Sequence, residues 1–141
     1  MHFKCVYNQG LLFEYRGNGL VRILDVVSGT YFSDVRMPFR KEDNKFIKLL
    51  DTWVSSNSNV VVIGWKYSKD RYRRVSHLSV YDLGAVKNPN SDPRYHLLYT
   101  LQFQFDIEKF VMDETRIAFT GMDGKNKRSV TVLNSVNFGF T

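Results

Sequence analysis

Residues 16–30, RGNGLVRILDVVSGT, contain the most informative pattern of the chain. A turn with Gly17 and Gly19 leads into a stretch in which polar and apolar residues alternate, as they do in a half-buried strand. The stretch ends with Leu24 and Asp25, and a Ser-Gly turn follows. Alternation bounded by turn-forming residues predicts one strand of an antiparallel sheet.

The same pattern recurs twice further along the chain. HLSVYDL at residues 77–83 and SVTVLNS at residues 129–135 alternate in the same way and finish with Asp or Asn. Asp25, Asp82 and Asn134 therefore occupy one position of a repeat, with spacings of 57 and 52 residues. A repeat of this length indicates an architecture assembled from equivalent supersecondary units.

Strand signals recur along the whole chain, whereas helical periodicity is scarce, so we expect an all-β fold. The strands fall into three groups of four: 3–7, 11–15, 21–26 and 30–35; 46–54, 60–67, 76–82 and 96–103; and 107–112, 116–120, 130–133 and 137–140. Two insertions, residues 69–75 and 85–94, lengthen the second group. The second strand of each group is mostly apolar, which predicts burial on both faces.

This repeat resembles the core of a WD repeat, in which a turn with Asp or Asn and Gly leads into a strand that ends in Trp-Asp. Leu24, Tyr81 and Leu133 stand where the Trp is expected. The preceding turns contain Asn18, Asp70 and Asp123. The Gly-His pair that opens a typical WD repeat is absent from all three units.

The resemblance implies a divergent WD-repeat β-propeller, and a partial one of about three antiparallel four-stranded blades. Blade 1 covers residues 1–40, blade 2 covers 41–104 and an incomplete blade 3 covers 105–141. Complete propellers have four to eight blades, so three blades leave sheet edges open. We therefore expect a fragment, a half-propeller that pairs with another copy, or a short member completed by a partner chain. Another antiparallel barrel or sandwich is the alternative architecture.

Composition restricts the class of protein further. The 141 residues are 43% hydrophobic, and Cys5 is the only cysteine, so no internal disulfide forms. Cys5 falls in a predicted apolar strand, where we expect a buried, inert thiol. The first residues lack the apolar region of a signal peptide, and the apolar run at 60–63 is too short to cross a bilayer. These features favour a cytoplasmic or nuclear protein without membrane association.

No motif predicts catalysis. His2, His77 and His96 lack metal-ligand spacing, and the last two are expected to be hydrogen-bonded structural histidines in strands. Gly17 and Gly19 precede no helix, so they do not form a phosphate-binding loop. We therefore expect no enzymatic activity, no cofactor and no metal.

The net charge of +6 is distributed unevenly. In a blade, the loop between the second and third strands and the loop that enters the next blade emerge on one face. These loops, residues 16–19, 36–45, 66–75 and 122–129, hold thirteen of the twenty basic residues and four acidic ones. The candidate partner-binding residues are Arg40, Lys66, Tyr67, Lys69, Arg71, Tyr72, Arg73, Arg74, Lys125, Lys127 and Arg128. The alternative is that these tips are basic because they are solvated and discourage edge pairing.

The basic face predicts a protein-interaction scaffold, or a substrate-recognition module, for acidic or phosphorylated segments of a partner. Through the resemblance, a specific version is the propeller portion of an F-box/WD-repeat protein in a ubiquitin ligase, although no F-box is visible in these residues. Nucleic-acid binding is one alternative, with Tyr67 and Tyr72 stacking on bases. A propeller fragment without independent activity is the other.

Overall fold

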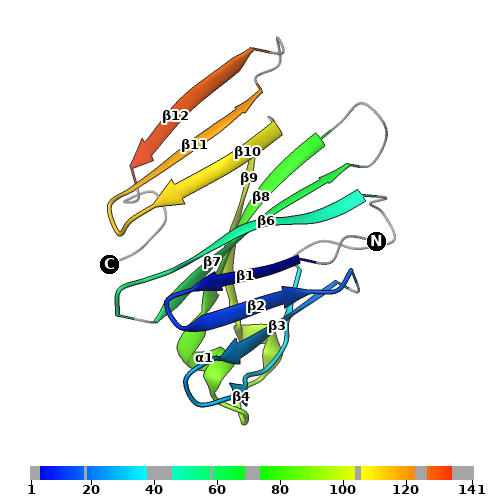
Figure 1. Ribbon diagram of the computed structural model, residues 1–141, viewed down its shortest axis with the longest axis vertical. Coiled ribbons are helices and arrows are strands. Elements are labelled where there is room, and N and C mark those ends of the chain that lie inside the picture. Colours follow the sequence, from blue (N-terminus) through cyan, green and yellow to red (C-terminus); the bar gives the residue numbers. More distant parts are fainter. Residues whose placement is uncertain are drawn as a thin grey trace.

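Three antiparallel sheets, each with strands joined in chain order, form the described part of the molecule (Figure 1). The computed structural model describes residues 4–17, 19–37, 46–57, 59–68, 74–103, 106–122 and 127–134. Sheet A contains β1 (Lys4–Asn8), β2 (Leu11–Tyr15), β3 (Leu20–Asp25), β4 (Thr30–Tyr31) and β5 (Val35–Arg36). Sheet B contains β6 (Phe46–Val54), β7 (Val60–Ser68), β8 (Arg74–Asp82) and β9 (Leu97–Phe103). Sheet C contains β10 (Asp106–Met112), β11 (Arg116–Met122) and β12 (Arg128–Asn134).

The all-β, antiparallel prediction is confirmed, and within the described residues no sheet closes on itself. The strand expected at residues 137–140 lies outside the described residues. The strand expected at 30–35 is interrupted: β4 and β5 pair with opposite ends of β3. Between them, the N–H of Phe32 donates to the carbonyl of Ile23 in β3 at 2.9 Å, and the N–H of Ser33 donates to the carbonyl of Val86 at 3.4 Å.

The three residues assigned to one repeat position are structurally equivalent. Asp25, Asp82 and Asn134 each end the third strand of a sheet and lie opposite the first residue of the second strand. Two of the side chains cap the turn that follows. Asp25 Oδ1 accepts the N–H of Val27 at 3.0 Å, and Asp82 Oδ1 accepts the N–H of Ala85 at 3.1 Å. Short carboxylates satisfy turn backbone in this way, which explains Asp at the end of a strand.

The insertion expected at residues 85–94 contains the helical part of the described chain. Helix α1 (Leu83–Lys87) follows β8 directly, and a 3₁₀ turn, η1 (Pro93–Tyr95), precedes β9. Leu83 and Val86 are buried, so the apolar side of α1 extends the core. The other insertion is shorter than expected, because β8 already begins at Arg74.

Two hydrophobic cores separate the three sheets, and sheet B contributes to both. The first core lies between sheets A and B and includes Phe13, Ile23 and Trp65. The second lies between sheets B and C and includes Val62 and Phe119. We call the face of sheet A or C that joins a core its inner face, and the opposite one its outer face.

The prediction that all second strands are buried on both faces is correct only for β7. From Val61 to Trp65 every residue of β7 is buried, whereas burial alternates along β2 and β11. The reason is the order of the sheets: B is covered on both sides, and A and C are each covered on one. Cys5 lies on the outer face of sheet A and is exposed, so the expectation of a buried thiol is wrong.

The first strands of the sheets lie side by side and run in the same direction (Figure 1). Strand β1 borders β6, and β6 borders β10. Lys4 Nζ donates to the carbonyl of Leu50 at 2.6 Å, and Asn8 Nδ2 donates to that of Thr52 at 3.0 Å. Because the first strands are parallel, corresponding ends of the three sheets lie on the same side of the molecule.

Gly64 allows sheets B and C to approach closely. It lies in the buried part of β7, where the ring of Phe110 from β10 packs on its backbone. A Cβ atom at this position would lie 2.4 Å from Cε1 of Phe110. The ring belongs to the second core and has little room to move.

We expect Gly64→Ala to lower the free energy of unfolding by about 1–3 kcal/mol, since it overpacks a dense core. Urea unfolding followed by circular dichroism measures the loss. Gly84→Ala in α1 is the control: a Cβ atom there would lie 3.3 Å from Asp82 Oδ1 at an exposed position, and the substitution should lower stability by no more than about 0.5 kcal/mol. In a Phe110→Leu background the loss caused by Gly64→Ala should shrink; an equal loss would contradict the contact.

Candidate basic interface

One end of the sheets gathers basic residues, and we call it the basic end. Strands β1, β6 and β10 begin there, and β2, β7 and β11 end there. Its exposed basic residues among those described are Arg16, Arg22, Arg36, Lys48, Lys127 and Arg128. Lys66, also at this end, is largely buried.

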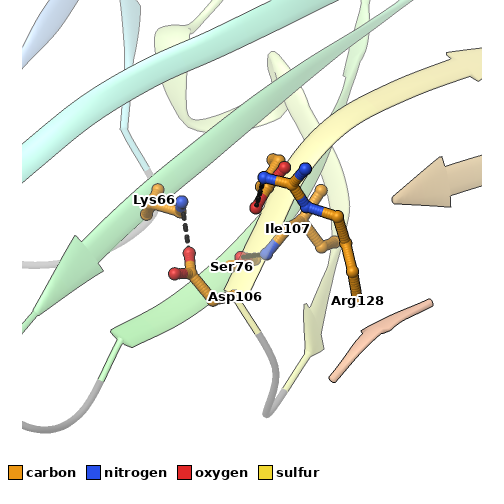
Figure 2. Close-up of polar contacts among 6 residues, drawn as sticks. Lys66, Ser76, Asp106, Ile107 and Arg128 are labelled. Carbon is orange, nitrogen blue, oxygen red and sulfur yellow. Dashed lines mark hydrogen bonds and ion pairs between the residues drawn. The ribbon is translucent and has the colours of Figure 1, made fainter. Parts of the chain in front are cut away.

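Lys66 joins sheet B to sheet C. Its ammonium group forms an ion pair with the carboxylate of Asp106, the first residue of β10 (Figure 2). The two side chains are only 17% and 22% exposed, so water screens the pair less than a surface pair. Lys66 was expected to contact a partner, but its charge is already neutralised within the chain.

A buried hydrogen bond lies next to this ion pair. The N–H of Ile107 donates to Ser76 Oγ at 3.0 Å, from the edge of sheet C to the middle of the sheet B face (Figure 2). Ser76 is fully buried. A β-bulge between Ile107 and Lys109 follows directly, and an unpaired backbone N–H in such a place would be costly. Ser76 and Lys66 therefore fix where β10 begins.

Two further basic residues are paired with acids of their own sheet. Arg128 Nη2 lies 3.2 Å from Glu108 Oε1, and Arg16 forms an ion pair with Glu14. The arginine side chains are 74% and 61% exposed, so these pairs contribute little to stability. They nevertheless reduce the charge that the basic end presents to a partner.

Tyr67 does not lie on the surface. It belongs to the first core, and its hydroxyl shares a hydrogen bond with His77 Nε2, 2.9 Å away. Burial lowers the pKa of His77 below its usual value, and this effect exceeds the opposing one of a hydrogen bond with Gln102. His77 is thus a hydrogen-bonded histidine inside the protein, as expected from its strand.

The remaining candidate contact residues divide into two groups. Lys127 and Arg128 are exposed at the start of β12, and Arg74 is the first residue of β8. The others lie outside the described residues: Arg40, Lys69, Arg71, Tyr72, Arg73 and Lys125. The turn residues Asn18, Asp70 and Asp123 lie outside them as well.

The opposite end of the sheets carries carboxylates that stabilise turns, and we call it the acidic end. Hydrogen bonds from Thr115, and then from the Arg116 N–H, hold the pKa of Asp113 below its usual range. Glu114 Oε1 accepts the N–H of Ser56 at 2.8 Å, which links sheet C to sheet B and lowers the pKa of Glu114. Because Ser56 and Glu114 are 58 residues apart, no local sequence signal indicates this link.

The described residues contain no arrangement of side chains that is typical of a catalytic site. No three of their His, Cys, Asp or Glu side chains are close enough together to hold a metal ion. His96, expected in a strand, instead ends η1, where its Nε2 lies 3.0 Å from Ser91 Oγ. No helix in the described part is long and apolar enough to span a membrane. What the basic end can supply is electrostatic attraction for an anionic partner.

Comparison with known proteins assigns no family. No family model matches the chain, and no curated protein matches it. Among solved structures, the computationally designed Ika4 protein is 12% identical, with a TM-score of 0.40 over 92% of this chain and 88% of that one. The computationally designed Ika8 protein is also 12% identical, with a TM-score of 0.35 over 92% of this chain and 44% of that one. Similarity this low supports no argument about fold or function.

The lowered pKa of His77 predicts pH-dependent stability. Between the folded pKa and about 6.5, the unfolded chain binds more protons at this residue than the folded chain. The stability that His77 contributes is therefore complete above about pH 6.5 and is lost as the pH falls through the folded pKa. The unfolding free energies of the wild type and His77→Gln should converge between pH 7.5 and pH 5.

Urea titrations at several pH values test this expectation. Tyr67→Phe is the control: it removes the hydroxyl but keeps the imidazole buried, so it should lower stability and retain most of the pH dependence. A constant difference between wild type and His77→Gln across this pH range would contradict the assignment.

Removing the carboxylate of Asp106, which is partly buried with Lys66, should destabilise the protein more than removing an exposed carboxylate. Asp106→Asn should lower the unfolding free energy by about 1–2 kcal/mol, because it leaves a poorly solvated ammonium group without its charged partner. Asp92→Asn is the matched control, since Asp92 forms an exposed pair with Arg94, and it should cost no more than about 0.5 kcal/mol. If urea unfolding gave the same loss of free energy for both variants, the ion pair between the sheets would stabilise the protein no more than an exposed pair.

Proposed function

We propose that this chain is a protein-interaction scaffold whose basic end binds an acidic or phosphorylated segment of a partner protein. In this proposal the three sheets are blades of a partial, WD-type β-propeller. The parallel first strands, which adjoin one another along one edge of the sheets, and the equivalent turn-capping residues Asp25 and Asp82 support that arrangement.

The observation that carries the proposal is the separation of charge between the two ends of the sheets. Arg36, Lys48 and Lys127 are exposed at the basic end. The described acids at that end, Glu14, Asp34, Asp106 and Glu108, are each paired with a basic residue of the same chain. At the acidic end, the described acids Asp25, Asp82, Asp92, Asp113 and Glu114 outnumber the basic residues Lys87, Arg94 and Arg116. An anionic segment is therefore attracted to one end and repelled from the other.

The scaffold suits such binding because its surface is held by strands. Lys48 stands on β6 beside β7, and Arg36 stands on β5, so both attachment points belong to hydrogen-bonded ladders. The ladders fix the backbone from which these side chains extend, and arginine can bind a carboxylate or phosphate through two parallel hydrogen bonds. The specific form that the WD resemblance implies is substrate recognition in an F-box ubiquitin ligase.

RNA is the competing anion, and the structure gives it less support. Base stacking requires exposed aromatic side chains, and Tyr67, one of the two residues expected to stack, is buried in the first core. A single-stranded RNA therefore serves as the competitor in the test of the proposal.

Fluorescence polarisation with a labelled acidic peptide, phosphorylated and unphosphorylated, tests the proposal. We expect binding that weakens steeply with salt, and a loss of at least about tenfold in the triple variant Arg36→Glu, Lys48→Glu, Lys127→Glu. The matched control reverses Lys87, Arg94 and Arg116, three exposed basic residues on the opposite side of the sheets, and should bind normally. Equal losses in both variants, or tighter binding of the RNA than of every peptide, would overturn the proposal.

A further inference from the structure

The two end sheets leave apolar outer faces exposed. Nine large apolar side chains are exposed among the described residues. Four, Tyr7, Val26, Val27 and Tyr31, belong to sheet A or the turn after β3, and three, Val111, Val130 and Val132, belong to sheet C. The other two are Tyr95 in η1 and Leu98 on β9. Sheet B, which is covered on both faces, contributes only Leu98. Exposure of apolar groups is thus concentrated at the ends of the stack of sheets.

The exposed residues of sheet C form a row across its outer face. Val111 lies opposite Ala118, and Ala118 lies opposite Val132, so the three side chains come from the three strands at one level. Val111 and Val132 are 71% and 60% exposed. The row lines a shallow groove of about 320 Å³ that Arg116 borders.

Sheet A carries a matching row on its own outer face. Tyr7, Leu12, Leu24 and Tyr31 lie opposite one another across β1, β2, β3 and β4. Tyr7 and Tyr31 are 65% and 56% exposed. This row, like that of sheet C, lies close to the acidic end of its sheet, so the two rows stand at the same level of the stack.

We propose that two copies of this chain form a closed pair, in which the outer face of sheet C of each copy packs on the outer face of sheet A of the other. Each contact repeats the relation that joins A to B and B to C. Such a contact is heterologous, and the two-fold pair closes it without leaving a free end. The surface concerned is separate from the basic end.

The area available favours the closed pair over a single contact. Three seven-residue strands span roughly 14 by 23 Å, so one contact buries only some ~700 Å² in total. Stable interfaces bury about 1,200–2,000 Å². Two such contacts reach that range, and in a closed pair both of them join the same two copies.

Light scattering coupled to gel filtration tests the proposal on the full chain at tens of micromolar. We expect a mass of two chains, against 16.5 kDa for one. Val132→Lys alone and Tyr7→Glu alone should each run as a single chain, since each places one charge in both contacts. Leu98→Lys, an exposed position outside both faces, is the control and should remain a pair. Circular dichroism verifies that each variant is folded.

A mixture of the two single-chain variants distinguishes contact of sheet C with sheet A from other modes of pairing. A mixed pair of Val132→Lys with Tyr7→Glu has one unaltered contact and one in which the introduced charges are opposite, so the mass of two chains should return. A wild type with the mass of one chain would overturn the proposal. So would a Tyr7→Glu variant that still pairs, as expected for contact of sheet C with sheet C, or a mixture that stays single.

Discussion

The free edge of β6 is the constraint on which the arrangement of the sheets depends. β6 pairs with β7 on one side only, and the carbonyls on its other side need donors. Side chains of sheet A supply them: Lys4 reaches Leu50, and Gln9 Nε2 donates to the carbonyl of Val54 at 3.2 Å. Donors on side chains satisfy the edge while keeping β1 from joining the ladder. The sheets therefore remain separate and stack by their faces.

Face-to-face stacking then determines which residues are buried. The middle sheet must be apolar on both sides, and the run from Val61 to Trp65 meets that requirement. The approach of sheet C is set by Gly64, where Phe110 fills the space of a missing side chain, and by the polar contacts of Ser76 and Lys66. Close packing and buried polar contacts thus act at the same junction, which gives β10 one position and one register.

Much of this architecture could be predicted because it follows from local periodicity. The positions of Asp25, Asp82 and Asn134 identify equivalent strands, and they end equivalent strands in the structure. The burial of Tyr67 was not predicted, because Tyr67, the last residue of the strand expected at 60–67, was also assigned to the loop at 66–75. Residues assigned to a loop therefore lie in a ladder, where alternation turns Tyr67 into the first core.

The charge of the basic end was overestimated for a different reason. Loops were counted alone, whereas Glu14, Asp106 and Glu108 lie in strands and neutralise basic residues of the same end through contacts that only the tertiary structure brings about. The binding surface is therefore narrower than the loop sequences indicate. It depends on basic groups such as Arg36 and Lys48, which have no ion-pair partner among the described residues.

Because part of the charge at the basic end is neutralised within the chain, pairing of two copies would strengthen the binding of an anionic partner. In the stacking proposed above, β1 of one copy runs parallel to β10 of the other, as β6 does within the chain. The basic ends of both copies then lie on the same side of the pair. A partner with two acidic segments would meet two modest sites at a fixed separation, and the second contact would be intramolecular. A pair would thus bind such a partner more tightly than a single copy, in which acids at the strand ends neutralise part of the basic charge.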